Sequence, residues 1–451
     1  MKVFKIIGKT VAWILIVVIA ILAVLCIVTL CWGAAQRMKG KVTENLPSVP
    51  EDFVPTVRLV AFTDTHNVND RVAAAIDKAY LLYDVDPVYA GVDGFFGLGD
   101  FTSVGGEGDF KNYADTIHAH VRPETKNITI LGNHEMKNKD EYNDLFKKYF
   151  GHDPNTVTEI NGFSCIAFSG ERSLTEWTFT PSSLKWAKEQ LDIAEEKAGD
   201  RPIFVFQHPH NFGTVYGSSV WCNFQTNVLW NGHNKVVNFS GHSHFPMNDP
   251  RSINQSSYTS VGIGAMARFE LENNYIVGQH PDGYDTAAQM CVIEANDKGS
   301  VRISGFDLNS DSYFCDYYIE NVNDPDSFAY TYKNMRAHDS KPVFKENAQA
   351  KAYRDGTGEW ILSFDEATCN FIVHDYKVVI KDEKGKTVLN KNFISDYYLT
   401  GGDEKTLFKA GKDTFEAGKT YTMKVTAKSA YHLKSDVFTM TFTAQGIINP
   451  S

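Results

Sequence analysis

The sequence predicts a layered α/β body followed by a small all-β domain. Short apolar runs typical of buried strands alternate with helical patterns from about residue 56 to residue 339. Beyond that point the chain holds only short strand-like runs separated by turn residues. Strands that alternate with helices form sheets covered by helices, and ligands collect outside the carboxyl ends of such strands.

Five apolar runs are predicted strands, and a polar motif follows each of them. Helical patterns lie between the runs, so we expect several parallel strands joined by helices. The predicted strands are 57–62, 94–98, 128–131, 203–206 and 236–240. The predicted helices are 72–83, 113–120, 140–150 and 182–198.

The polar motifs contain residue types that bind divalent metal ions. A mixture of imidazoles, carboxylates and an amide oxygen suits borderline ions better than calcium or a thiolate-bound structural zinc. One such motif alone is most often turn chemistry, but five in order, each after an apolar run, favour a single metal site. The motifs are Asp64-Thr65-His66, Gly99-Asp100, Gly132-Asn133-His134-Glu135, His208 and Gly241-His242-Ser243-His244.

We predict that these residues hold two adjacent ions that share Asp100. A shared carboxylate keeps two cations about 3.5 to 4 Å apart, and a water between them exists as hydroxide near neutral pH. Hydroxide is the nucleophile that in-line attack on phosphorus requires. The first ion is assigned to Asp64, His66, Asp100 and His244, and the second to Asp100, Asn133, His208 and His242.

Three residues are predicted to contact the substrate. His134 follows a ligand and is not needed as one, so we assign it to transition-state stabilisation or to protonation of the leaving group. Asn133 is expected to serve both metal and substrate. Arg251 has the fork geometry that clamps a phosphate, although the alternative is an ion pair with a neighbouring carboxylate.

The five motifs resemble those of the calcineurin-like metallophosphoesterase superfamily over roughly Thr56 to Leu308. The resemblance implies a four-layer αββα sandwich with a dinuclear centre, the ligand roles given above, and His134 as the catalytic histidine. It implies a small phosphate ester as substrate, with monoester and diester both open. The two divalent ions are manganese, iron, zinc or nickel, since such sites accept several metals.

One departure from that family concerns the residues around the second motif. Many members carry an acidic or amide side chain soon after the Gly-Asp pair, whereas this chain continues as Phe101-Thr102-Ser103. We therefore expect weaker support around the ligands here.

The amino terminus predicts a membrane anchor. Residues 11–35 carry no charge and are long enough to cross about 30 Å of hydrocarbon as a helix. Residues 1–10 would form a short cytoplasmic tail, and 36–55, with three prolines, a linker that lifts the enzyme off the bilayer. Three basic residues lie on each side of the segment, so charge does not set the orientation. We predict a single-pass protein of the cell membrane with an extracellular catalytic domain; the same enzyme facing the cytoplasm is the alternative.

Composition limits the partners of the soluble body. The net charge is −11, and residues 1–41 hold six basic and no acidic residues, which leaves −17 for the rest. An acidic body argues against long nucleic acids, whose binding depends on basic side chains. The cysteines show neither a disulfide framework nor a zinc cluster. A catalytically silent binding or scaffold protein on the same fold is the second functional hypothesis, although no ligand is missing.

Residues 340–451 are predicted to form a separate immunoglobulin-like β-sandwich after a catalytic domain at 56–339. This region resembles a fibronectin type III domain, chiefly through residues 415–427, and it holds no cluster of carboxylates or histidines. A packing or spacer module is therefore favoured over a carbohydrate-binding one, without catalysis. The predicted strands are 360–364, 376–380, 387–389, 420–426 and 438–442.

Overall fold

The structure of the protein is a computed structural model. It describes residues 39–447 except 138–140, 172–177, 217–220, 274–275 and 400–404, together with Trp13, Ile16, Val17 and Ala20. The predicted anchor at 11–35 thus lies outside the described residues apart from those four. Within the described part of the chain, no helix combines the length and apolar character needed to span a bilayer.

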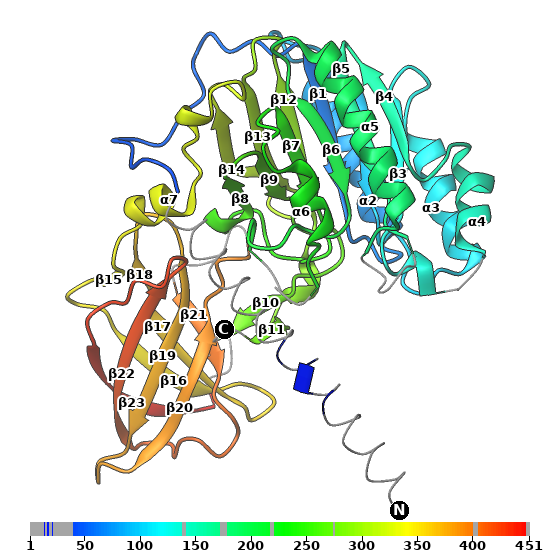
Figure 1. Cartoon of the computed structure of the whole chain (residues 1–451). Helices are drawn as coiled ribbons and strands as arrows, with labels where there is room; N and C mark the ends of the chain where they lie inside the picture. Colours follow the sequence, from blue (N-terminus) through cyan, green and yellow to red (C-terminus); the bar gives the residue numbers. More distant parts are fainter. Residues whose placement is uncertain are drawn as a thin grey trace, which may run out of the picture.

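Two six-stranded sheets form the centre of the α/β domain (Figure 1). The first has the order β14-β13-β12-β1-β2-β3, in which β1, β2 and β3 are parallel and β12 runs antiparallel to β1. Its strands are β1 Val57–Phe62, β2 Gly94–Leu98, β3 Lys126–Ile130, β12 Gln289–Ala295, β13 Val301–Asp307 and β14 Ser312–Ile319.

The second sheet has the order β4-β5-β6-β7-β9-β8, with four parallel strands and an antiparallel strand at each edge. Its strands are β4 Thr156–Ile160, β5 Phe163–Phe168, β6 Ile203–Gln207, β7 Val236–Ser240, β8 Ile253–Gln255 and β9 Thr259–Gly262.

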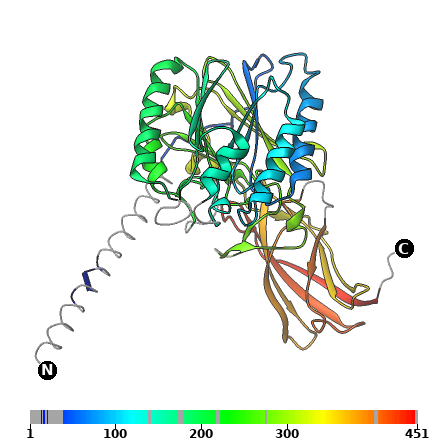
Figure 2. The ribbon, with the colours of Figure 1, turned by 90° about the vertical axis from the view of Figure 1, so that its right-hand side faces the viewer.

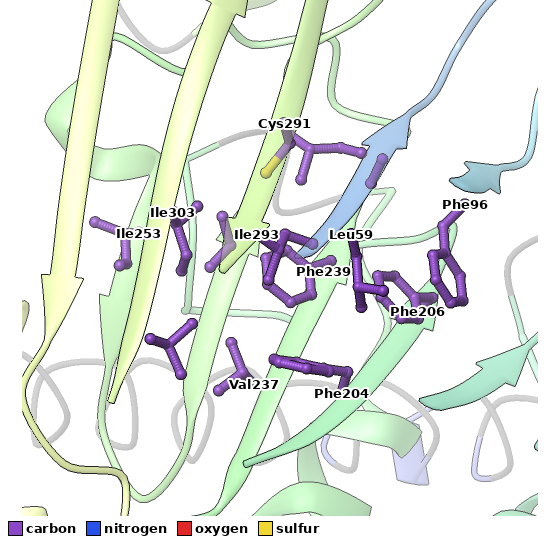
Figure 3. Close-up of a cluster of buried hydrophobic side chains, with 14 of the residues drawn as sticks. Leu59, Phe96, Phe204, Phe206, Val237, Phe239, Ile253, Cys291, Ile293 and Ile303 are labelled. Atoms are coloured by element: carbon purple, nitrogen blue, oxygen red, sulfur yellow. The ribbon is translucent and has the colours of Figure 1, made fainter. Parts of the chain in front are cut away.

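The two sheets pack face to face through every second side chain of their strands. Leu59 of β1 and Phe204 and Phe206 of β6 point into one shared core, in which the ring centroids of Phe96 and Phe206 are 3.9 Å apart (Figure 3). The intervening residues, such as Val60 and Ile203, face the outer surfaces and pack on helices. Every side chain of β1 and β6 is buried, as expected for strands covered on both faces.

Helices cover both outer faces, so the domain has four layers. The helices α2 (Asn69–Tyr83), α3 (Glu107–His120) and α4 (Tyr142–Phe150) lie on the first sheet, and α5 (Pro181–Ala198) and α6 (Gln225–Trp230) on the second. Figure 2 shows α5 in green and α2 in blue on opposite sides of the strands. The αββα layering expected from the motifs is therefore present.

The C-terminal region is all-β. Its main sheet has the order β20-β19-β22-β23-β16-β17-β21, and a short pair, β15 with β18, lies beside it. Phe364 of β17 and Tyr376 of β19, which are not neighbouring strands, meet at 5.1 Å in one core, so the sheet folds over on itself. Its strands are β15 Val343–Phe344, β16 Ala350–Arg354, β17 Trp360–Asp365, β18 Ala367–Thr368, β19 Val373–Lys381, β20 Thr387–Ile394, β21 Lys405–Lys409, β22 Thr420–Ser429 and β23 Phe438–Ile447.

A mixed apolar cluster joins the all-β region to the α/β domain. Phe245 and Phe269 of the α/β domain pack with Ile394 and Tyr398 of the all-β region, and the short hairpin β10 (Leu271–Asn273) and β11 (Ile276–Gln279) contributes Leu271. All five side chains are buried. The two parts thus share a hydrophobic contact immediately after the Gly241–His244 motif.

The chain before β1 does not run as a free spacer. Thr43 N donates to Asn334 Oδ1 at 2.8 Å, and Thr43 O lies 3.0 Å from His338 Nε2, both on α7 (Tyr332–His338). Leu46 packs against the core between the sheets. Thr43 and Leu46, in the described part of the predicted linker, therefore contact the α/β domain.

Candidate metal centre

All five motifs lie at the same edge of the two sheets, where parallel strands end. Asp64 and His66 follow β1, Asp100 follows β2, and Asn133 with His134 follows β3 of the first sheet. His208 follows β6, and His242 with His244 follows β7 of the second sheet. Since the sheets pack face to face, the loops from both converge on one place.

Left-handed backbone conformations mark these loops. Asp64, His66, Asp100, His242 and His244 have φ values of 53°, 41°, 49°, 67° and 54°. This region is uncommon for residues other than glycine and costs of order 1 to 3 kcal/mol each, so it persists only where the surroundings impose it. All five of these residues are predicted ligands. The fold therefore accepts backbone strain at these positions in order to place the ligand side chains.

Glycines allow the loops to approach one another. A Cβ on Gly99, whose φ is 81°, would lie 2.6 Å from Gly132 N, and one on Gly241 would lie 2.7 Å from Asp64 Oδ2. Neither distance is tolerated by real Cβ atoms. The glycines of the motifs are therefore required by close packing between neighbouring loops.

Asp64 lies at the first cluster of ligand atoms. Its Oδ1 is 3.0 Å from His244 Nε2, 3.9 Å from His208 Nε2 and 4.0 Å from His66 Nε2. This oxygen is buried and makes no hydrogen bond within the described structure. A buried carboxylate oxygen that several imidazole nitrogens approach is the arrangement that a divalent cation fits.

Asp100 belongs to both groups of candidate ligands. Ligand atoms of Asp64, His66, Asp100 and His244 lie within 4.8 Å of one another, as do those of Asp100, His208 and His242. Asp100 Oδ2 is 3.2 Å from His208 Nε2, and Asn133 Oδ1 is also 3.2 Å from that nitrogen. The structure thus brings together all seven predicted ligands, with Asp100 between the two groups.

Backbone carbonyls orient the imidazoles. His208 Nδ1 lies 2.7 Å from Leu98 O, and His244 Nδ1 lies 3.0 Å from Arg268 O. Nδ1–H groups that donate to these oxygens orient both rings with Nε2 toward the cluster. The two carbonyls therefore set the ring orientation that a metal ligand needs.

Burial and neighbouring charge set the protonation states. Desolvation, reinforced by the charge of His244, lowers the pKa of His66 to about 3, and desolvation with the charge of His208 lowers that of His242 to about 3. Burial opposes charge on Asp64, yet the nearby imidazoles hold the pKa of its carboxyl below the ordinary value. Burial also opposes charge on His208 and His244, yet Asp100 raises the pKa of His208 to about 10 and Asp64 raises that of His244. A cation bound here would take the place of the protons on these two imidazoles.

Glu135 is a functional residue that the sequence interpretation missed. Its carboxylate is fully buried and accepts hydrogen bonds from the backbone N–H groups of Asp100 (2.9 Å), Thr102 (2.8 Å) and Gly132 (2.7 Å). It ties the second and third motifs together and so holds Asp100 in place. The expectation of weak support around the ligands was therefore wrong: the acidic residue comes from the third motif, where Glu135 directly follows His134.

His134 lies beside the candidate ligands rather than among them. Its Nε2 is 3.8 Å from Asp100 Oδ2, its ring centroid is 4.5 Å from that of His66, and its side chain is 20% exposed. Nδ1 lies 2.8 Å from Ser103 O, and Lys137 Nζ lies 3.2 Å from Nε2. An imidazole in this position can reach both the cluster and a molecule bound over it.

Arg251 forms an ion pair with a neighbouring carboxylate, which was the alternative to phosphate binding. Its Nε and Nη2 both donate to Asp249, at 2.8 and 2.6 Å, and its guanidinium lies 3.4 Å from the centroid of the Tyr216 ring. Tyr216 in turn reaches His374 of the all-β region, with Oη 3.1 Å from Nε2. Arg251 thus pairs with a neighbouring carboxylate close to the contact between the two parts, and substrate binding by it stays a prediction.

Comparison with known proteins identifies the first part of the chain. Residues 57–246 match the model of the calcineurin-like phosphoesterase family, so the chain carries a calcineurin-like phosphoesterase domain. No curated protein matches the chain.

The solved structures that match the chain are remote in sequence. A purple acid phosphatase from yellow lupin (Lupinus luteus) shares 12% identity at a TM-score of 0.42 and covers 58% of this chain, which spans 53% of that protein. A cold-active protein-tyrosine phosphatase from a Shewanella species shares 14% identity (TM-score 0.25; 61% and 86% covered). Fibronectin(III)-like modules of Clostridium thermocellum CbhA share 10% (TM-score 0.15; 40% and 79% covered).

Proposed function

We propose that this protein is a dinuclear metal-dependent phosphoesterase that hydrolyses a small phosphate monoester or diester. The observation that carries the proposal is the position of Asp100, which is shared by two groups of buried ligand atoms. Two bound cations would acidify a water and neutralise negative charge on the phosphoryl group. Manganese, iron, zinc and nickel all suit this donor set.

The residues of the chain have distinct roles in this proposal. Asp64, His66, Asp100 and His244 would hold one ion, and Asp100, Asn133, His208 and His242 the other. Glu135 keeps Asp100 in position through the N–H groups described above. His134 faces the cluster with a partly exposed ring and would give a proton to the departing oxygen.

We further propose that the enzyme is anchored in the cell membrane by residues 11–35 and acts outside the cytoplasm. The uncharged length of that segment supports an anchor. The docking of Thr43 on α7 supports an enzyme held close to its attachment point. Protease protection of the catalytic domain in intact cells would contradict the external orientation.

Removal and replacement of metal test the enzymatic proposal. Residues 39–451 are stripped with a chelator, refilled with each candidate metal in turn, and assayed with p-nitrophenyl phosphate and bis(p-nitrophenyl) phosphate. We expect turnover of at least one ester to return with the metal, at two ions per chain. Binding of two ions without turnover of any ester would favour a catalytically silent protein on the same fold.

A further inference from the structure

The cluster of predicted ligands is open to solvent on one side. Most of its members are almost fully buried: Asp64, Asp100 and His208 are at most 1% exposed. His242 is only partly buried, and the side chain of His134, which lies beside the cluster, is 20% exposed. Solvent therefore reaches the cluster beside these two rings, and a substrate must enter there.

Trp221 lies at this opening. The centroid of its ring is 6.4 Å from that of His242, the two planes meet at 63°, and the residue is 38% exposed. Phe224, three residues later, instead stacks face to face on Phe212, with ring centroids 4.2 Å apart and planes at 19°. The indole of Trp221 meets the imidazole edge to face, so a partly exposed aromatic surface borders a predicted ligand.

Backbone hydrogen bonds fix the position of Trp221 independently of its side chain. Asn223 N donates to His210 O at 2.8 Å, and Phe212 N donates to Asn223 O at 3.0 Å. These bonds close the loop between β6 and α6 two residues from Trp221 and directly after His208. Replacement of the indole therefore leaves the loop closed.

The surface beside His242 suits a flat aromatic group. An indole stacks on aromatic rings and on any nucleobase, since each has a π-face. A sugar would also need hydrogen-bond partners for its hydroxyl groups. Two asparagines of the loop and of α6 are hydrogen-bonded within the fold: Asn211 Nδ2 donates to Tyr258 Oη at 2.8 Å, and Asn227 Nδ2 donates to Phe212 O at 2.9 Å. This favours an aromatic group over a sugar.

We propose that Trp221 is a substrate-binding residue whose indole stacks on an aromatic or heteroaromatic group esterified to the phosphate. In this arrangement the phosphoryl group lies over the ligand cluster, and the aromatic ring extends past His242 onto the indole. The inference rests on the proposed phosphoesterase function and deepens it, because it names the class of ester.

The kinetic test uses the metal-loaded chain with Trp221→Ala, Trp221→Phe and a control, Val228→Ala, at a side chain of α6 that is 74% exposed. We expect Trp221→Ala to raise KM about 5- to 100-fold for the p-nitrophenyl ester that the wild type hydrolyses, the usual effect of losing one stacked ring. Trp221→Phe should recover part of the loss because it keeps an aromatic face, and the control should match the wild type. An unchanged KM in Trp221→Ala would contradict the inference.

Calorimetric titration with phosphonates, which the enzyme does not hydrolyse, gives a readout independent of turnover. The wild type should bind phenylphosphonate about 5- to 100-fold more tightly than methylphosphonate. Cyclohexylphosphonate should bind less tightly than phenylphosphonate, because its ring is not flat. Trp221→Ala should lose the preference for the phenyl group, while its affinity for methylphosphonate and its content of two metal ions stay unchanged.

The titration also separates this inference from the proposed function. Equal affinity of the wild type for the phenyl and methyl compounds, or for the phenyl and cyclohexyl compounds, would overturn the inference while the proposed function stands. An undiminished preference for the phenyl compound in Trp221→Ala would do the same. A wild type that binds two ions but hydrolyses no ester would instead refute the proposed function, and the phosphonates would still decide whether Trp221 binds an aromatic group.

Discussion

At the scale of single residues, a variant of His134 distinguishes a loss of catalysis from a loss of metal binding. It lies 3.8 Å from Asp100 Oδ2 but is absent from both groups of candidate ligands. We expect His134→Ala to retain two ions and to lose about 10²- to 10⁴-fold in kcat, the usual contribution of a general acid. Elemental analysis and steady-state kinetics check this, with the exposed His118→Ala as the control. Full activity in His134→Ala would remove the role assigned to it.

A variant of Glu135 tests whether a residue that is not a metal ligand holds the ligand Asp100 in position. Glu135→Gln keeps the shape but places an amide N–H₂ opposite backbone N–H donors. We expect a loss of about 1 to 3 kcal/mol in unfolding free energy and metal affinity reduced about 10- to 100-fold. Urea denaturation and competitive metal titration measure the two effects. The exposed Glu124→Gln should change neither, and wild-type metal affinity in Glu135→Gln would exclude the proposed positioning.

At the scale of the elements, the loops after the strands depend on glycine. A Cβ on Gly241 would collide with the Thr63 side chain and approach Asp64 Oδ2. We expect Gly241→Ala to displace Asp64 and to reduce metal affinity more than about tenfold, because the carboxylate would no longer reach the ion. Gly108→Ala in α3, where a Cβ meets nothing within 4 Å, is the matched control. Circular dichroism should show the same secondary structure in both variants.

Strand positions were predictable because a strand buried on both faces leaves an apolar run in the sequence. Strands β1, β2 and β7 have the predicted bounds. Helix α3 begins at Glu107, six residues before the predicted start, because Glu107 and Asp109 stabilise a polar first turn that carries no apolar period. In the all-β region, β22 extends three residues past the predicted strand, to Ser429, and β23 extends five residues, to Ile447.

The site was predictable where ligands follow strands and unpredictable where support comes from distant segments. Glu135 lies inside a recognised motif, so its residue type was the available signal. Arg268 lies 24 residues beyond His244 in a loop without a motif, and only the fold brings it to the cluster. The pairing of Arg251 with Asp249 also needed the geometry, because the sequence allowed either partner.

At the scale of the whole molecule, the α/β domain and the all-β region are in contact beside the Gly241–His244 motif. Tyr398 is 3% exposed, packs in the mixed cluster with Phe245 and donates its hydroxyl to Asp282 O. Tyr431 Oη also donates to Pro250 O at 3.3 Å, which strengthens the same contact. The all-β region therefore supports the chain that leaves His244.

This contact predicts cooperative unfolding of the full chain. We expect one calorimetric transition in the wild type, and a destabilisation of about 3 to 5 kcal/mol in Tyr398→Ala, as for other large buried aromatic side chains. The variant should also bind metal less tightly, since the support behind His244 is weakened. Leu407→Ala, at a side chain that is 59% exposed, is the control. Two separate transitions in the wild type would contradict this coupling.

The most direct test of the central claim is anomalous diffraction from crystals of the protein loaded with manganese. We expect two peaks about 3.5 to 4 Å apart, with Asp100 between them. One peak should lie against Asp64, His66 and His244, and the other against Asn133, His208 and His242. A single peak, or none at these residues in crystals that contain manganese, would contradict a dinuclear centre.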